Sequence, residues 1–281
     1  MGRLPIYPHI MRTVEWTVLA YLAYVAGLAC VWPLRRPVRV TVVAVAAADA
    51  VVMLWLGAQT AAGARVLRDW MPAAHILIGY RLTGPFFSSP MPGLEARLVA
   101  SDRWWFDTAG LAAFTRRAPR LILELFELAY ASAYVMVPLG FALVIRSRAP
   151  VDADRYWTPV AAAALVCYGM LPWIRARTPD ALGAHTDINA RALSLRRLNR
   201  GIQRYGSVRV ATIPSGHSAA AVATALMAGA GVPGALTPLL VLAAVIAVAS
   251  VIGRYHYAAD ALLGAAVGVA AVLLSGRMPT G

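Results

Sequence analysis

Residues 237–253 read TPLLVLAAVIAVASVIG, and residues 256–275 read HYAADALLGAAVGVAAVLLS. The two apolar stretches are separated by the polar break GRYH at 253–256. A helix needs roughly 20 mostly apolar residues to cross the hydrocarbon core of a bilayer, and both stretches come close to that length with almost no charge inside them. They therefore predict two neighbouring transmembrane helices joined by a polar connection.

Apolar windows of similar length recur along the rest of the chain. Sixty per cent of the 281 residues are hydrophobic and 14% are charged, and the mean hydropathy of +0.64 is far above that of a soluble domain of this size. The further windows lie at about 14–33, 38–58, 121–145, 156–174 and 214–231. We therefore expect an all-α, polytopic membrane protein with about six to seven transmembrane helices.

Residues 59–120 have a different character. Arg, Asp, Pro, Gly and aromatic residues interrupt every apolar run there, as in DRWWFD at 102–107. This pattern favours short helices that lie in the membrane interface. We therefore separate 1–120, an N-terminal transmembrane hairpin followed by an interfacial amphipathic segment, from 121–281, a helical-bundle core. Both parts belong to one membrane domain.

The formal net charge of +13 comes from arginine alone, because the chain contains no lysine. In a soluble protein this balance would indicate nucleic acid as the partner. Arginines that lie between apolar windows instead contact lipid headgroups, set the orientation in the membrane or hold an anionic substrate. We expect membrane lipids as partners and no nucleic acid, and the sequence indicates no protein partner.

Pro214-Ser215-Gly216-His217 joins a polar loop to an apolar helix. Proline fits the first turn of a helix, and glycine lets a ligand approach the backbone closely. The amide groups and positive end of the helix attract a phosphate, Ser215 adds a hydroxyl donor, and His217 can donate or accept a proton. The segment predicts a phosphate site, with a structural Ser-Gly turn and an interface histidine as the alternative.

His256 and Asp260 lie four residues apart at the start of the last apolar window. That spacing puts both side chains on one face of a helix. A carboxylate there can bond one ring nitrogen of His256, which fixes the tautomer and raises the nucleophilicity of the other nitrogen. Ionisable residues in a membrane segment are costly and mark functional sites. A His-Asp pair that only caps the helix is the alternative.

Arginines supply the third element, because developing negative charge on a phosphate needs fixed cations where the dielectric is low. We select Arg177, Arg200 and Arg254 as phosphate-binding residues. The other arginines of the 175–213 loop are expected to contact headgroups or solvent. His185 and Asp187 are weaker candidates from the same loop.

Together these residues resemble the type-2 phosphatidic acid phosphatase superfamily over about 156–275. Its members share a basic stretch ending in Arg-Pro, a Pro-Ser-Gly-His stretch and an Arg-containing stretch ending in His-x-x-x-Asp. The second stretch is intact and the third ends correctly, whereas Arg177-Thr178-Pro179 stands where Arg-Pro is usual. The usual arginine of the third stretch falls on Ser250. The Arg-x-His-Tyr-x-x-Asp form is similar to the branch containing inositol phosphorylceramide synthase-like phosphotransferases.

The resemblance implies a phosphatase-type helix-bundle core and a phosphohistidine mechanism. His256 would attack phosphorus, Asp260 would orient it, and His217 would protonate the leaving oxygen and then activate water. The phosphate would be bound, without a metal or another cofactor, by Ser215, Gly216, Arg177 and Arg254. We expect a membrane enzyme that hydrolyses a lipid phosphate or diphosphate, and transfer of a lipid headgroup to an alcohol is the close alternative.

Two other kinds of site use the same residue types. A transporter could use both histidines and Asp260 as a proton or ion relay, but a relay needs polar residues through the depth of the bilayer, whereas these cluster at one surface. Two histidines and one carboxylate could also hold a metal ion. Activity that is insensitive to a chelator would eliminate the metal site.

Seven alternating spans would place the N-terminus and all the candidate site residues at one membrane face. The opposite face would then carry the arginines of short segments, which are Arg35, Arg36, Arg39, Arg146, Arg148, Arg155 and Arg277. By the positive-inside rule, the active site is expected on the non-cytoplasmic face.

Overall fold

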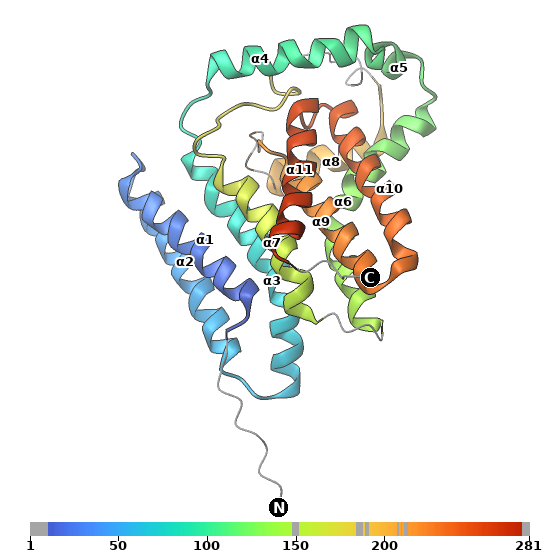
Figure 1. Ribbon diagram of the computed structural model, residues 1–281. Helices are drawn as coiled ribbons and strands as arrows, with labels where there is room; N and C mark the ends of the chain where they lie inside the picture. The colour runs from blue at the N-terminus through green and yellow to red at the C-terminus, as the bar shows by residue number, and fades with distance from the viewer. Residues whose placement is uncertain are drawn as a thin grey trace, which may run out of the picture.

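The computed structural model describes residues 11–147, 152–183, 188, 191–206, 208, 210 and 213–276. Within these ranges the chain forms helices and no strand, which confirms the all-α prediction. The helices form a bundle whose upper end in Figure 1 is crossed by α4 and α5. Their bounds are α1 Thr13–Val31, α2 Arg36–Gly57, α3 Ala62–Thr83, η1 Gly84–Phe86, α4 Pro92–Arg103, η2 Trp104–Thr108, α5 Leu111–Arg117, α6 Arg120–Arg146, α7 Ala153–Gly169, α8 Ser194–Gly206, α9 Gly216–Gly231, α10 Pro233–Ile252 and α11 Ala258–Leu274.

Four of these helices, α1, α2, α6 and α10, are long and apolar enough to cross a bilayer. The apolar helix α11 has 17 residues, and α7 and α9 have 17 and 16 residues and pack among the longer helices. Large apolar side chains such as Leu54, Trp55 and Val135 point outward, where only lipid can cover them. The prediction of a polytopic helical membrane protein is therefore confirmed.

The centre of the core is α9, which touches α6, α7, α10 and α11. Small residues at this crossing let the backbones come close together. On α11, a Cβ atom at Gly264 would collide with the carbonyl oxygen of Ser215, and one at Gly268 would lie 2.5 Å from that of Ala219. The N–H of Ser215 donates to the carbonyl oxygen of Asp260 at 3.0 Å. The first turns of α9 and α11 are therefore in direct backbone contact.

Replacing Gly264 with alanine should push these two turns apart, because the colliding atoms belong to the backbone and cannot rotate away. Forced overpacking of this kind costs about 1 to 3 kcal/mol. We expect Gly264→Ala to lower the thermal unfolding temperature of the detergent-purified protein. The control is Gly234→Ala in α10, where a Cβ atom meets nothing within 4 Å. Equal unfolding temperatures for the two variants would contradict the close contact.

Residues 62–83 differ from the predicted short interfacial helices. They form one helix, α3, of 22 residues, which packs against α1, α2 and α7. At 1.5 Å per residue this helix is roughly 33 Å long, enough to cross a bilayer. Its polar side chains have partners on α1 and α2, because Arg68 Nε lies 2.6 Å from Glu15 Oε1 and His75 Nδ1 lies 2.9 Å from Asp49 Oδ1. The expected short helices are found only beyond α3, as α4, η2 and α5.

The structure also changes the expected positions of the connecting segments. The N–H of Val14 donates to Asp154 at the start of α7, and the Tyr24 hydroxyl donates to the Gly169 carbonyl oxygen at its end. Accordingly α1 runs parallel to α7, and the α1–α2 turn with Arg35 and Arg36 lies at the end that α7 reaches. The candidate site lies at that same end, so Arg35, Arg36 and Arg39 share its face, and the membrane side of the active site stays a prediction.

Because α1 runs parallel to α7, the start of α1 and the site should lie on opposite sides of the membrane. Two single-cysteine variants, Thr13→Cys and Ala181→Cys, each with Cys30 and Cys167 replaced by serine, test this arrangement in sealed vesicles of one orientation. We expect a membrane-impermeant maleimide to label only one of them. A permeant maleimide should label both as a control. Labelling of both by the impermeant reagent would restore the seven-span arrangement.

Candidate active site

A cavity of about 330 Å³ lies between α3, α6, α8 and the polar segments that precede α9 and α11. Its walls are tyrosines of α3 and α6, polar side chains of α8 and two histidines. The principal lining residues are Tyr80, Tyr130, Tyr134, Asp180, Arg200, Gln203, Arg204, His217 and His256. The cavity therefore combines two proton-transferring groups with cations beside an aromatic wall.

His256 is placed by a sharp turn after α10. The N–H groups of Tyr255 and His256 both donate to the carbonyl oxygen of Ser250, at 2.9 and 3.1 Å, and Arg254 has a left-handed φ of 62°, which is uncommon outside glycine. The Nδ1 atom of His256 lies 3.2 Å from Oδ2 of the fully buried Asp260. With Nδ1 held by the carboxylate, Nε2 is the ring nitrogen left for a ligand.

His217 is the second residue of α9, and Ser215 caps this helix. The Ser215 hydroxyl accepts the N–H of Ser218 at 3.3 Å. The ring of His217 packs against those of Tyr130 and Tyr134. Its centroid is 5.7 Å from the centroid of the His256 ring. The structure therefore brings the two predicted catalytic histidines together at one cavity.

Gly216 is required for packing as well as for any approach of a ligand. A Cβ atom at this position would collide with the ring of Tyr168, which lies against the first turn of α9. Gly216 lines a smaller apolar groove beside the cavity. Ser215 is fully buried as the helix cap.

The side chains of Arg177 and Arg254 form ion pairs with two carboxylates of α4, which lie seven residues apart on that helix. Arg177 donates from Nε and Nη2 to Glu95 at 3.0 and 2.8 Å, and its backbone N–H also donates to Glu95. This paired hydrogen bonding with Arg177 lowers the pKa of the Glu95 carboxyl group. Arg177 is therefore held by Glu95 of α4. It is not among the residues that line the cavity, where the sequence analysis predicted that it would bind the phosphate.

Arg254 is fully buried, and its Nη1 lies 2.7 Å from Oδ2 of Asp102. Its guanidinium carbon lies 4.2 Å from the centre of the Phe106 ring, a cation–π geometry. The other Asp102 oxygen accepts the N–H of Ala258, the first residue of α11, at 3.0 Å. Asp102 therefore holds both sides of the segment that carries His256, and Arg254 supports the site from behind instead of facing the cavity.

Arg200, which the sequence analysis selected as a phosphate-binding residue, lines the cavity. Its Nη2 lies 3.1 Å from Oδ1 of Asp180, whose own N–H donates to the carbonyl oxygen of Arg254 at 3.0 Å. Arg204, one turn further along α8, lines the same cavity. Two arginines of α8 thus contribute positive charge next to the histidines.

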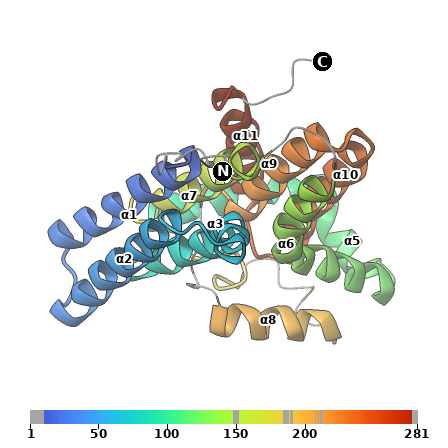
Figure 2. The ribbon, with the colours of Figure 1, turned by 90° about the horizontal axis from the view of Figure 1, so that it is seen from below.

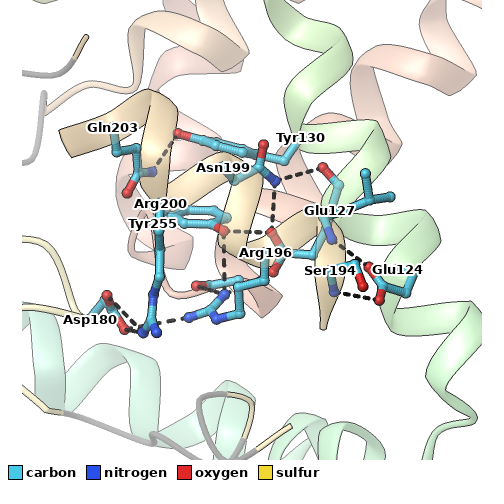
Figure 3. Close-up of polar contacts among 12 residues, drawn as sticks. Glu124, Glu127, Tyr130, Asp180, Ser194, Arg196, Asn199, Arg200, Gln203 and Tyr255 are labelled. Atoms are coloured by element: carbon cyan, nitrogen blue, oxygen red, sulfur yellow. Dashed lines mark hydrogen bonds and ion pairs between the residues drawn. The ribbon is translucent and has the colours of Figure 1, made fainter. Parts of the chain in front are cut away.

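A buried polar network holds α8 and the His256 turn against α6 (Figure 3). Arg196 Nη1 lies 2.8 Å from Glu127 Oε1 and donates to the carbonyl oxygen of Gly253 at 2.9 Å. Asn199 and the Tyr255 hydroxyl both donate to Glu127 Oε2. The Arg196 and Glu127 side chains are only 3% and 2% exposed, so their charges are compensated inside this network and not by water. The network fixes Tyr255, the residue before His256.

Several of these residues escaped the sequence analysis. Glu95, Asp102, Asp180 and Arg204 lie in no motif. The partners of Glu95 and Asp102 are far away in the chain, 82 residues for Glu95 and Arg177 and 152 for Asp102 and Arg254. The weaker candidates His185 and Asp187 lie outside the described residues. Within the part of the chain that the structure describes, no three His, Cys, Asp or Glu side chains are grouped to hold a metal ion.

Asp102→Asn should destabilise the protein and distort the site, because it removes the carboxylate that pairs with the buried Arg254. Breaking a buried ion pair on one side costs about 3 to 5 kcal/mol. We expect a marked fall in thermal unfolding temperature, measured in detergent. Asp107→Asn, an exposed position in the next helical turn, is the matched control and should change little. Similar unfolding temperatures for both variants would mean that the Asp102 contact contributes nothing.

Comparison with known proteins agrees with this geometry. A family model described as the PAP2 superfamily matches residues 160–280, which include both histidines and Asp260. Neither curated proteins nor solved structures match the chain. The matched residues comprise most of α7 and the whole of α8 to α11. The helical core formed by residues 160–280 is therefore similar to the PAP2 superfamily, and this match supports an enzyme of the phosphatase or phosphotransferase type.

Proposed function

We propose that this membrane enzyme hydrolyses a lipid phosphate or diphosphate through a phosphohistidine intermediate. The observation that carries the proposal is the pairing of His217 and His256 across 5.7 Å at one cavity, with Asp260 holding Nδ1 of His256 from behind. A group that attacks phosphorus and a group that moves the proton must flank the same phosphate, and the close approach of these two rings at one cavity supports such an arrangement.

In the first step, Nε2 of His256 donates its electron pair to phosphorus and forms an N–P bond. The P–O bond to the lipid alcohol breaks, and its electron pair goes to the leaving oxygen, which takes a proton from His217. Asp260 stabilises the positive charge that develops on the His256 ring, the role of an orienting carboxylate. The products of this step are phosphorylated His256 and the lipid alcohol, or the lipid monophosphate when the substrate is a diphosphate.

In the second step, His217 takes a proton from water while the water oxygen attacks phosphorus. The N–P bond breaks, its electron pair returns to His256, and inorganic phosphate leaves. Arg200 and Arg204 lie where they can neutralise the phosphate oxygens, and the amide groups at the start of α9, at Gly216 and His217, add hydrogen-bond donors. We assign Arg177 and Arg254 to positioning, through Glu95 and Asp102 of α4.

Transfer of the phosphoryl-bearing headgroup to an alcohol uses the same two steps, with the alcohol in place of water. The two activities differ only in which nucleophile reaches the intermediate. An assay for phosphate release therefore has to be run with and without an alcohol such as glycerol, and the lipid products of both reactions compared.

The decisive assay measures phosphate release from lipid phosphates and diphosphates by the purified protein in detergent with EDTA. We expect wild type to release phosphate and His256→Gln to fall at least 1,000-fold, because the nucleophile is lost. Loss of a positioned proton-transfer group typically costs about 100- to 10,000-fold, so His217→Ala should fall within that range. Unchanged unfolding temperatures show that the variants are folded.

Each other outcome points to a different function. Activity that EDTA abolishes would replace the phosphohistidine mechanism with a metal site formed by the same side chains. A headgroup product that appears only with the alcohol would identify a phosphotransferase. No turnover of any phosphate lipid by folded wild type would reject the enzyme proposal and favour an ion or proton relay.

A further inference from the structure

The helix α8 bridges the two helices α6 and α3. At its start, the N–H groups of Ser194 and Leu195 donate to the Glu124 carboxylate of α6, at 2.7 and 2.9 Å. At its end, Arg81 of α3 donates from Nη1 to the carbonyl oxygen of Gly206 at 3.0 Å. Figure 2 shows α8 lying across the outer side of the bundle beside these two helices. The polar face of α8 forms one wall of the catalytic cavity.

An apolar groove of about 190 Å³ adjoins the cavity between α3 and α6. Ala73, Ile76 and Leu77 of α3 line one side, and Ala133 and Val137 of α6 line the other. The groove lies against α9 and α7 at Ala220 and Tyr168, so its inner surface is also apolar. Leu77 is 58% exposed and Tyr134 is 40% exposed, which places the rim of the groove in contact with lipid.

The groove and the cavity are neighbours that share three lining residues, Tyr80, Tyr134 and His217. One end is polar and contains the two histidines and the α8 arginines, and the other end is apolar and faces the bilayer. A molecule that fills both must carry phosphate at one end and hydrocarbon at the other. The small volume of the groove, below the usual 300 to 1,000 Å³ of drug-sized sites, suits a section of one chain.

We propose that the groove between α3 and α6 holds one hydrocarbon chain of the substrate, which reaches the cavity sideways from the bilayer beneath α8. This inference rests on the proposed function, because the phosphate of the same lipid must lie between His217 and His256. It assigns substrate selection to α3, which lies outside the residues matched by the family model.

The groove acts by orientation more than by affinity. Moving a chain from the bilayer into an apolar groove exchanges one apolar surrounding for another, so little hydrophobic free energy is gained. Holding the chain nevertheless restricts where the phosphate can lie, and correct placement of a reacting group is worth large factors in rate. A block in the groove should therefore reduce the rate with long-chain substrates and spare a substrate that has no chain.

The experiment compares a single-chain lipid phosphate with para-nitrophenyl phosphate, a water-soluble ester without a chain. Ala73→Leu and Val137→Phe fill the groove from opposite sides. We expect each variant to lower kcat/KM for the lipid at least 10-fold and to leave the soluble ester within twofold of wild type. Ala74→Leu, the adjacent position on α3 that does not line the groove, is the control and should leave both substrates unchanged.

A second measurement does not depend on turnover. A single-chain lipid phosphate carrying a photoreactive group midway along its chain should crosslink to peptides containing residues 73–77 and 133–138, with less crosslinking in Ala73→Leu. Three results would each contradict the proposal that the groove binds a chain: equal losses of kcat/KM for both substrates, unchanged lipid turnover in the filled variants, or crosslinks confined to other helices. If wild type cleaves neither substrate but crosslinks at the groove, the proposed catalysis fails while the chain site stands.

Discussion

The N–H of Ser215 donates to the carbonyl oxygen of Asp260, and this hydrogen bond joins the first turns of α9 and α11. The contact is possible because glycine occupies the facing position 264 on α11. His217 lies two residues after one end of the bond and His256 lies four residues before the other. The separation of the two rings is therefore set by backbone packing, which is far stiffer than a pair of side chains on loops.

Around this contact, the site depends on carboxylates that come from outside the matched family region. Asp102 and Glu95 of α4 hold Arg254 and Arg177, and Glu127 of α6 holds Arg196. A buried guanidinium is costly without a partner, so α4 and α6 stabilise the part of the bundle that carries the candidate site. Residues 92–103 accordingly cover the end of the bundle as a support for the His256 turn, which gives the polar segment before α6 a structural role.

Much of the fold could be predicted from the sequence, because apolar windows report directly on membrane helices. The windows near α1, α2, α6 and α10 are apolar over almost their whole length, and each corresponds to a long helix. The helix α3 was missed because Arg68 and His75 lower its hydropathy, and the carboxylates that pair with them lie on α1 and α2. Hydropathy averaged over a sequence window contains no information on ion pairs between helices. Polar residues that are paired inside a helix bundle therefore give the same average as polar residues of a helix in the membrane interface.

The candidate site likewise contains residues whose geometry could be predicted from the sequence and residues whose geometry could not. His217, His256 and Asp260 lie in short motifs whose local spacing determines their geometry, and the structure brings them together. Arg254 lies two residues from His256, yet its side chain turns away because Asp102 lies on the other side of the backbone. Proximity in sequence is thus a weak guide to where a long side chain ends, whereas a helical spacing of four is a strong one.

The pair formed by Asp49 and His75 has a consequence for how the chain enters the membrane. Both side chains are almost completely buried, one on α2 and one on α3, and an unpartnered charge near the centre of a helix opposes insertion by about 3 kcal/mol. Each of the two helices is therefore more stable in the membrane when it is packed against the other. A second pair, between Glu15 of α1 and Arg68 of α3, joins α1 to them. The first three helices should consequently leave the insertion machinery as one assembled unit, before the catalytic core is synthesised.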